Sequence, residues 1–313
     1  IKFILIMDAL SDIAFFALLV RHGNLTSAAR ELDVTPPAVS RRLALLENRL
    51  GIRLLNRTTR RVSLTYEGEL YLEEGRRILD DLGELEQRVS SGHSVPRGLL
   101  RVNASFGFGR EYVTPIVAEF LQAYPEVEVQ LRLTDRPINL VEEGFDVCVR
   151  FGHVPDARVV ARKIASNRRY LCAAPAYLEK YGVPATPNEL RQHKCIVIHQ
   201  TNAAVGAWRL SNGTEEETVK VRGAVVTNDG DAAVAMALRG LGILERSEWH
   251  VAPYIRSGKL QLLLPDWVLP AADIYVVYPV RKNLSAKVRA FVNHLADSIA
   301  AHQVVTDGVM NQW

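Results

Sequence analysis

The chain has 313 residues, which is long enough for two or three domains that each bury a sizeable core. Its apolar content of 48%, its charged content of 23% and its net charge of +3 are ordinary for a globular protein. The three cysteines are widely spaced and lack metal-ligand spacing, so we expect buried free thiols and a reducing compartment. No apolar run in the sequence is long enough to span a membrane. We therefore expect a cytoplasmic protein without a cofactor, a metal or a membrane partner.

The first predicted helix begins at Asp8 or Ser11 and ends at Gly23, a residue that readily closes a helix. The apolar residues 1–6 before it are too short for a signal peptide and are soon followed by acids. The helix has a buried stripe at helical spacing, made of Ile13, Phe16, Ala17 and Val20.

Residues 25–50 predict two short helices joined by a tight turn at Asp33. Thr26 is expected to cap the first helix and Thr35 the second, in which Pro36 and Pro37 fit the first turn. The second helix buries one apolar stripe, made of Val39, Leu43, Leu46 and Leu50. Its opposite face carries Ser40, Arg41 and Arg42. Such a helix is typical of one that lies in a DNA major groove, and the alternative is a helical hairpin with a solvated basic face.

The segment RLLNRTTRRVSLT, residues 53–65, predicts a two-stranded wing with a basic tip that suits phosphates and a narrow minor groove. From Arg21 to Arg61 there are nine arginines against three acids, a net charge of +6. The whole chain carries only +3, so positive charge is concentrated on this segment, as binding to double-stranded DNA requires.

Residues 15–69 resemble the N-terminus of LysR-type transcriptional regulators. The landmarks are SAAREL, PPAVSRR, LE-x-x-LG-x-x-L, RTTRRV and LT-x-x-G, and the rest of the chain has the family's layout and length. The resemblance implies a winged helix-turn-helix domain over residues 7–64, with residues 1–6 an upstream extension. It places DNA contacts at Thr35, Pro36, Pro37, Ser40, Arg41, Arg42, Arg57, Thr58, Thr59, Arg60 and Arg61.

A long linker helix is predicted over residues 65–91, where two apolar series repeat every seven residues. The series are Tyr71, Ile78, Leu85 and Gly75, Leu82, Val89. The other faces are acidic, so we expect this helix to pair with its copy in a homodimer or homotetramer. Gly68 and Gly75 would then allow the partner to approach closely. The alternative is that the helix packs on its own domain.

A hinge over residues 92–97 leads to an α/β region, residues 98–300, with a loose tail at 301–313. Strands and helices alternate there, including helices at 110–124 and 138–143, which predicts a parallel sheet covered by helices. The layout resembles a two-lobed periplasmic-binding-protein fold, the effector domain of LysR-type regulators. We expect lobe I at about 98–167 and 272–300, and lobe II at about 168–271.

Ligands in such folds lie between the lobes, at strand ends and helix N-termini. From strand ends and from the resemblance we expect an effector site of Ser105, Phe106, Thr134, Arg150, Phe151, His199 and Asn228. Backbone N–H groups with one or two basic side chains favour a small carboxylate as inducer. Three alternatives remain. Ser105 and Asn228 are then simple helix caps, Arg150 an ion-pair partner of Asp146 or Asp135, and His199 a core residue.

One segment departs from the family pattern. After Gly242 the chain continues LERSEWH, with Glu245 and Arg246 where many members have apolar residues and a proline. This places charge near the cleft, so the ligand of a particular member is not transferable.

The function that we expect is a ligand-responsive transcription regulator that binds an interrupted-dyad DNA site and contacts RNA polymerase. One alternative is an enzyme, but the sequence has no catalytic triad order, P-loop or zinc motif, and Gly107 and Gly109 lack the third glycine of a dinucleotide fingerprint. The other is a solute receptor, which would lack an export signal and would follow a DNA-binding module.

Overall fold

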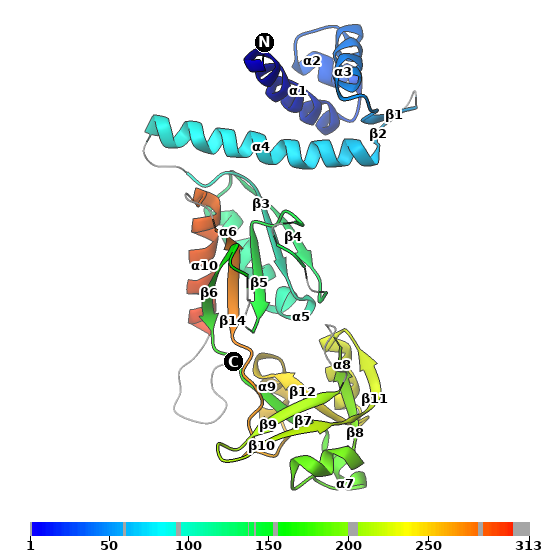
Figure 1. The fold of residues 1–313 in the computed structure, drawn as a ribbon, viewed down its shortest axis with the longest axis vertical. Helices are drawn as coiled ribbons and strands as arrows, with labels where there is room; N and C mark the ends of the chain where they lie inside the picture. Colours follow the sequence, from blue (N-terminus) through cyan, green and yellow to red (C-terminus); the bar gives the residue numbers. More distant parts are fainter. Residues whose placement is uncertain are drawn as a thin grey trace. The chain divides into compact units, whose positions relative to one another are not determined.

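The computed structural model describes residues 2–58, 61–91, 95–136, 138–140, 142–152, 156–199, 206–280 and 284–302. The chain forms two units, Ile1–Val95 and Pro96–Trp313 (Figure 1). None of the described helices combines the length and the apolar character that a membrane span requires.

Unit 1 consists of helices and a short hairpin: α1 (Lys2–His22), α2 (Leu25–Glu31), α3 (Pro36–Leu50), β1 (Leu55–Thr58), β2 (Arg61–Leu64) and α4 (Tyr66–Ser91). α1 begins at Lys2 rather than at Asp8 or Ser11, because no glycine or proline interrupts the preceding run. The core contains Phe16, Leu19, Ala28, Ala29, Val39, Leu46 and Leu54.

The turns of unit 1 follow from local chemistry. Asn24, not Thr26, caps α2, since the side-chain oxygen of Asn24 accepts a hydrogen bond from the Ser27 N–H at 2.7 Å. Asp33 has a φ of 52°, as expected of a residue in the tight turn. Thr35 stands at the start of α3 but makes no side-chain capping bond.

The first half of α4 packs on its own unit. A Cβ atom on Gly68 would lie 2.0 Å from the carbonyl oxygen of Leu54, and one on Gly75 would lie 2.6 Å from the Cγ2 atom of Ile13. These glycines therefore allow close approach within the chain, and the prediction that they admit a partner is wrong. Tyr71 faces inward too, with its ring centroid 5.6 Å from that of Phe16.

The second half of α4 leaves apolar side chains exposed. Ile78 is 48% exposed, Leu85 49% and Val89 80%. Ile78 and Leu85 continue the seven-residue repeat of Tyr71, and Val89 continues that of Gly75 and Leu82. The apolar repeat of α4 is therefore packed within unit 1 along the first half of the helix and exposed along the second half.

Lobe I of unit 2 is built on a five-stranded sheet in the order β4-β3-β5-β14-β6. The strands are β3 (Gly98–Ala104), β4 (Val127–Leu133), β5 (Val147–Phe151), β6 (Val159–Ala165) and β14 (Ile274–Pro279). β3 pairs in parallel with β4 and β5, whereas β14 runs antiparallel to β5 and β6. The sheet is mixed rather than parallel as predicted, because β14 returns from lobe II and enters it in the opposite direction.

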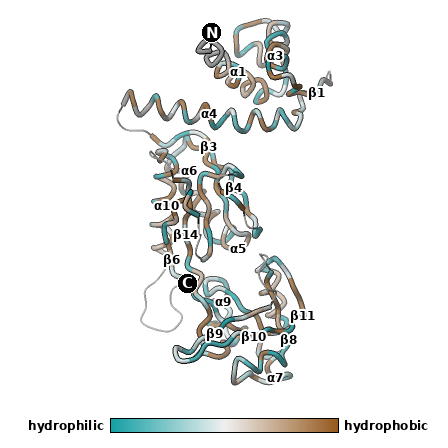
Figure 2. The backbone as a smooth tube through the Cα atoms, in the orientation of Figure 1, coloured by the Kyte–Doolittle hydropathy of each residue, from teal (hydrophilic) through white to brown (hydrophobic). Residues whose placement is uncertain are grey.

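The helices of lobe I are α5 (Phe106–Phe108), the π-helical turn η1 (Gly109–Val113), α6 (Thr114–Ala123) and α10 (Ala286–His302). The predicted helix at 138–143 is wrong, because the described residues of that segment form turns. Brown, hydrophobic stretches run through the strands and along α10 in Figure 2. In the core of lobe I the ring centroids of Phe120 and Phe291 are 5.1 Å apart.

Lobe II has its own five-stranded sheet, in the order β11-β8-β12-β7-β13, and a separate hairpin of β9 and β10. The strands are β7 (Arg169–Ala173), β8 (Lys194–Ile198), β9 (Ala207–Ser211), β10 (Glu216–Lys220), β11 (Arg222–Thr227), β12 (Ile243–Ser247) and β13 (Gln261–Leu263). The helices are α7 (Pro175–Tyr181), the 3₁₀ turn η2 (Pro187–Gln192), α8 (Gly230–Leu238) and α9 (Glu248–Arg256).

The chain passes between the lobes near Asn167 and Ala272. The buried Asn167 amide donates to the carbonyl oxygen of Ala272 at 2.9 Å and to the hydroxyl of Ser247 at 3.2 Å. Trp249, on α9, packs into the core of lobe I. These contacts fix the junction that the ligand cleft adjoins.

The cysteines Cys148, Cys172 and Cys195 are buried and free, as predicted. Burial raises the pKa of each thiol to about 12, so the reactive thiolate is scarce at neutral pH.

Candidate functional site

The start of α3 presents polar residues to solvent. Thr35, Pro36, Pro37, Ser40 and Arg41 are all exposed. Val39 and Leu46 lie on the opposite side, where each is 1% exposed. The helix therefore has one side fully used by the core and another free to meet a ligand as large as DNA.

Arg42 differs from its neighbour Arg41. Its Nη2 atom donates to the hydroxyl of Ser11 at 2.6 Å, its Nε atom lies 3.6 Å from Asp12, and its guanidinium stacks 4.6 Å from the ring centroid of Phe15. These contacts hold α3 against α1, so Arg42 has a structural role. Arg41 has no ion-pair partner among the described residues, which makes it the arginine of this pair that is available to a base or a phosphate.

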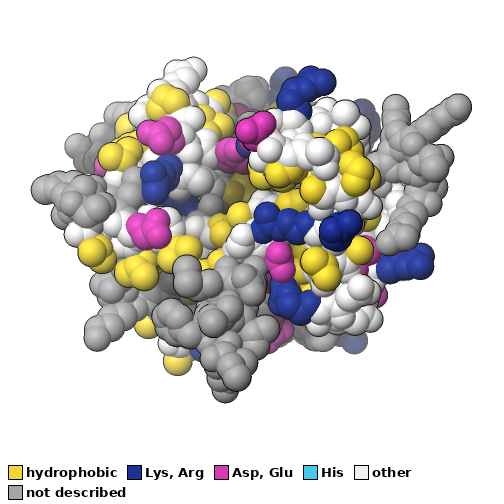
Figure 3. Space-filling model, turned by 90° about the horizontal axis from the view of Figure 1, so that it is seen from above, with side chains coloured by type: hydrophobic (Ala, Val, Ile, Leu, Met, Phe, Trp, Pro, Cys, Tyr) yellow, Lys and Arg dark blue, Asp and Glu magenta, His cyan; other side chains and the backbone are white. Residues whose placement is uncertain are grey.

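The predicted wing is a two-stranded antiparallel hairpin in which Arg57 pairs with Val62 and Thr58 with Arg61. Thr59 and Arg60 lie outside the described residues, as do the side chains of Arg57, Thr58 and Arg61. In the view of Figure 3, Lys and Arg side chains stand on the visible surface with Asp and Glu side chains among them.

Glu47 connects α3 to the wing. This carboxylate is only 7% exposed, and its Oε1 atom accepts backbone N–H bonds from Leu54 at 2.9 Å and Leu55 at 3.3 Å. Leu54 in turn accepts from Thr65 N–H at 3.0 Å, where α4 begins. One buried side chain thus positions the recognition helix, the wing and the start of the linker helix relative to one another.

We expect Glu47→Ala to lower the free energy of unfolding of unit 1 by about 3 kcal/mol, since two buried N–H groups lose a charged acceptor. Denaturant unfolding of the full chain, with hydrogen exchange of the Leu54 and Leu55 amides, measures the effect. Asn48→Ala, at an exposed position next to Glu47, is the control. Unchanged protection of both amides in Glu47→Ala would contradict this role.

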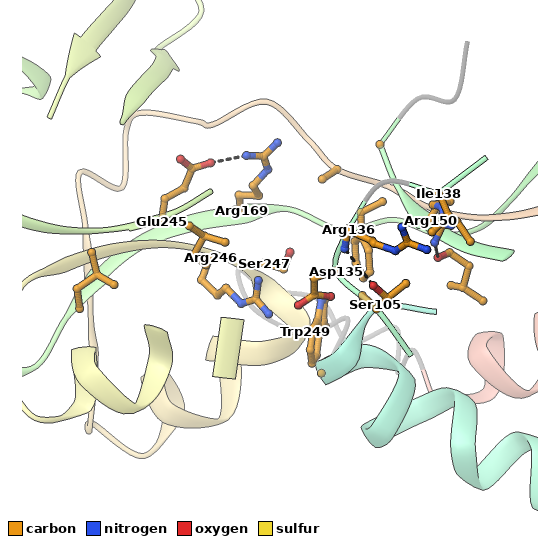
Figure 4. Close-up of a pocket in the computed structure, with 18 of the residues that line it drawn as sticks. Ser105, Asp135, Arg136, Ile138, Arg150, Arg169, Glu245, Arg246, Ser247 and Trp249 are labelled. Carbon is orange, nitrogen blue, oxygen red and sulfur yellow. Dashed lines mark hydrogen bonds and ion pairs between the residues drawn. The ribbon is translucent and has the colours of Figure 1, made fainter. Parts of the chain in front are cut away.

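A pocket of about 490 Å³ lies between the two lobes of unit 2 (Figure 4). Lobe I contributes the ends of β3, β4 and β5, and lobe II contributes β7, β8, β12 and the start of α9. Apolar walls are made by Ile138, Val149, Phe151, Ile196, Ile198, Trp208 and Trp249, and charged groups by Asp135, Arg136, Arg150, Arg169, Glu245 and Arg246.

Four of the seven predicted effector residues line this pocket: Ser105, Thr134, Arg150 and Phe151. Phe106, His199 and Asn228 do not. His199 and Asn228 are exposed: His199 directly follows Ile198, the last residue of β8 to line the pocket, and β11 contributes no lining residue. Nor do these two residues fit the alternatives, since His199 is not in the core and α8 is capped by Asp229 instead of Asn228.

In the segment after β3, not every backbone N–H group is free to bind an anion. Its Phe106 N–H donates to the carboxylate of Asp135 at 2.9 Å, so an acid of the chain already holds one of the groups predicted to bind an anion. Ser105 makes no capping bond to α5, which leaves its hydroxyl on the pocket wall.

Two pocket arginines are paired with acids. Arg136 donates to Glu143 at 2.8 Å, and Arg169 forms an ion pair with Glu245. The remaining arginines, Arg150 and Arg246, have no carboxylate within ion-pair distance among the described residues. The uncompensated positive charge of the pocket therefore lies at these two positions.

Arg150 is the arginine of lobe I. Its Nη1 atom donates to the side-chain oxygen of Asn103 at 2.7 Å, whereas its buried Nη2 atom has no partner among the described residues. Burial lowers the pKa of Arg150, but an arginine remains charged at neutral pH. Neither acid of the predicted alternative pairs with it, since Asp146 accepts from the Arg101 N–H. A buried guanidinium with an unused donor is a suitable group for a carboxylate.

Arg246 is the arginine of lobe II. Its Nε atom donates to Nδ1 of His250 at 3.0 Å, and its guanidinium lies 5.5 Å from the Trp249 ring centroid. A Cβ atom on Gly230 would lie 2.0 Å from Arg246 Nη2, so only glycine leaves room for this side chain. Burial lowers the pKa of Arg246 to about 10 and that of His250 to about 3, so that His250 is neutral and can accept.

The segment LERSEWH predicted charge near the cleft, and its residues Glu245 and Arg246 line the pocket. Asp135, Arg169 and Trp249 also line the pocket but were not predicted to do so. Asp135 follows Thr134 directly at a strand end, so that signal was available. No sequence signal pointed to Trp249, because it lies on α9, which belongs to the other lobe.

Two family models match this chain. The model described as "Bacterial regulatory helix-turn-helix protein, lysR family" matches residues 10–69, and the one described as "LysR substrate binding domain" matches residues 93–300. The first match spans α2, α3 and the wing, and the second spans both lobes and the pocket.

Curated relatives extend over nearly the whole chain. It is 40% identical over 296 residues to the HTH-type transcriptional regulator DmlR of Escherichia coli (strain K12), covering 95% of this chain and 96% of that protein. It is 38% identical over 286 residues to the HTH-type transcriptional activator TtdR of the same strain, covering 91% and 92%.

Solved structures agree with this result. CrgA, a LysR-type transcriptional regulator from Neisseria meningitidis, is similar with a TM-score of 0.59 at 30% identity, covering 92% of this chain and 97% of that chain. The Vibrio cholerae virulence activator AphB, a member of the LTTR protein family, is similar with a TM-score of 0.59 at 26% identity, covering 92% and 98%.

Proposed function

The chain belongs to the LysR family of transcriptional regulators, and from this premise we propose that its inducer is a small carboxylate bound in the interlobe pocket. The chain is a regulator rather than an enzyme, with a helix-turn-helix that binds DNA. What the proposal adds is the chemistry of the ligand, the residues that hold it and the assembly on DNA.

The observation that carries the carboxylate proposal is the guanidinium of Arg150, which lines the pocket and pairs with no carboxylate among the described residues. Arg150 lies near the end of β5, Ser105 follows the neighbouring strand β3, and Thr134 follows the next strand, β4. The same pocket therefore offers a carboxylate one charged donor and two hydroxyls. Apolar walls then enclose the rest of a small organic acid.

We expect Arg150→Ala to weaken binding of the best carboxylate about 10- to 100-fold, the value of a charge-assisted hydrogen bond. A thermal-shift screen of small mono-, di- and aromatic carboxylates identifies that ligand. Titration then follows the fluorescence of Trp208 and Trp249, which line the pocket. Arg136→Ala, which removes a pocket arginine already paired with Glu143, is the matched control. No carboxylate that shifts the melting temperature, or equal binding by both variants, would refute the proposal.

For DNA, we propose that Arg41 and Ser40 of α3 contact bases or phosphates and that the wing contacts the backbone. Arg41 is exposed, whereas Arg42 binds Ser11 of α1, and this difference supports assigning the DNA contact to Arg41. Thr35, Pro36 and Pro37 lie at the same exposed end of α3 and belong to the proposed surface, as do residues 57–61 of the wing.

We expect Arg41→Ala to weaken binding to the chain's own upstream DNA about 10- to 100-fold, with a shallower dependence on salt. Arg42→Ala should instead lower the melting temperature, because Arg42 joins α3 to α1. Gel shifts at several salt concentrations and thermal unfolding separate the two effects. Arg41→Lys is the matched variant that keeps charge but loses bidentate geometry. Full affinity of Arg41→Ala at all salt concentrations would exclude Arg41 from the interface.

On DNA we propose a homodimer, or a homotetramer made of two dimers, joined through the exposed half of α4 and bound to an interrupted dyad. The exposed Ile78, Leu85 and Val89 support this assembly. Binding of a carboxylate between the lobes then changes the angle between them. The residues that link the units transmit this change, which alters the DNA bend and the contact with RNA polymerase.

A further inference from the structure

Asp135 is an acid in the middle of the pocket. It follows β4 and accepts the Phe106 N–H at 2.9 Å, and Figure 4 places its carboxylate between the side chains of lobe I and those of lobe II. The other pocket acid, Glu245, is paired with Arg169. Asp135 has no cation within ion-pair distance among the described residues, so no direct contact neutralises its charge.

Charged groups face Asp135 from three elements. Arg246 on β12 and Arg110 on η1 favour its ionised form, and Asp229, which precedes α8, opposes it. Burial is the largest influence, and the net result is a raised pKa for Asp135. On its own segment, Arg136 is held by Glu143.

The remaining ionisable groups nearby are already engaged. Asp231 on α8 pairs with Arg110 and lies 3.3 Å from Nε2 of His250. His250 on α9 has a pKa of about 3 and so takes up no proton near neutrality. Asp135 is therefore the pocket acid that pairs with no cation among the described residues, whereas Glu245 pairs with Arg169.

The carboxylate site proposed above adjoins Asp135. In the sheet, Ala104 pairs with Leu133 and Asn103 with Cys148, so the ends of β4, β3 and β5 lie side by side. Neighbouring strands are about 5 Å apart and β3 lies between β4 and β5, so Ser105 is about one strand spacing from Asp135 and Arg150 about two. An anion held between Ser105 and Arg150 in this half-buried site raises the pKa of Asp135 and so favours its protonated form.

We propose that Asp135 is a specificity-determining residue that takes up one proton when the anionic inducer binds, so that the pocket accepts an anion together with a proton. This inference rests on the proposed carboxylate site. The proton comes from solvent and adds to a carboxylate oxygen of Asp135, and no bond of the ligand changes. The protonated acid remains in the pocket as a hydrogen-bond donor to the bound anion.

The sign of the pH dependence follows from linkage. Ionised Asp135 repels the anion and protonated Asp135 does not, so affinity rises as pH falls from the pKa of the liganded state toward that of the free state. We expect the wild type to bind oxalate more tightly as pH is lowered from about 8 to about 6, with a slope of at most about tenfold per pH unit for one proton. Oxalate is the probe because both of its carboxyls stay ionised over this range, so that the proton belongs to the protein.

Asp135→Asn should abolish this pH dependence and bind oxalate at about pH 8 at least as tightly as the wild type. The change removes the charge but leaves an oxygen to accept the Phe106 N–H. Glu245→Gln, which alters the paired pocket acid, should keep the wild-type slope. The full chain is titrated by tryptophan fluorescence, and calorimetry in two buffers of different ionisation enthalpy counts the protons taken up.

Proton uptake by the wild type and by Glu245→Gln, but not by Asp135→Asn, would establish the proposal. An equal slope in Asp135→Asn, or a slope lost only in Glu245→Gln, would overturn the role of Asp135 and leave the carboxylate site intact. No saturable binding of oxalate at either pH would overturn this inference, and binding unchanged in Arg150→Ala would refute the carboxylate site as well.

Discussion

The double substitution Ile78→Glu and Leu85→Glu is expected to convert the proposed dimer to monomers and to weaken binding to a two-half-site DNA about 10²- to 10⁴-fold. Both side chains are about half exposed on one stripe of α4, and four charges would meet there in a dimer. The large effect arises because two linked DNA-binding units act at a high effective concentration, which a monomer loses without any change in its own contacts.

Light scattering or analytical ultracentrifugation measures the mass, and gel shifts with whole and half sites measure the affinity. Glu73→Ala and Glu86→Ala, which change exposed acids of the same helix, form the control. Binding to a single half-site should be nearly unchanged in the double variant. A dimer that persists in the double variant would show that another surface joins the subunits.

The second large effect is expected for Trp249→Ala, which should lower the free energy of unfolding of unit 2 by about 3–5 kcal/mol. The indole is 5% exposed and packs on lobe I, with ring centroids 5.4 Å from Phe108, 5.9 Å from Tyr112 and 6.3 Å from Phe151. Because α9 belongs to lobe II, the substitution removes packing between the lobes as well as core volume.

Denaturant unfolding and hydrogen exchange of β5 and α5 measure this loss, and the carboxylate titration shows whether the pocket survives. Trp249→Phe retains most of the packing and should lose much less. Val268→Ala is the control for an exposed apolar position in the same unit. An unchanged melting temperature in Trp249→Ala would mean that the lobes are held together without this ring.

Features that depend on a few neighbouring residues could be predicted from the sequence. The start of α3 at Pro36 and the turn at Asp33 follow from local backbone preferences, and the stripe of Val39 and Leu46 follows from helical period. The parallel arrangement of β3, β4 and β5 followed from the alternation of strands and helices.

Features that depend on distant partners could not be predicted in the same way. The period of α4 is the same whether α1 or another subunit covers it, so the sequence could not assign Gly75 to Ile13. The roles of Arg41 and Arg42 differ only because Ser11 and Asp12 lie beside one of them. Charged residues more than a hundred positions apart, such as Asp135 and Arg246, line the same pocket, and no local pattern carries that information.

The close fit of Gly68 against Leu54, together with the buried Glu47, has a mechanical consequence. The helix-turn-helix cannot rotate freely about its junction with α4, so the two move together as one rigid body. In an assembly joined along α4, the protein sets the separation of the two DNA half-sites. A DNA site with a different spacing then has to twist or bend in order to bind.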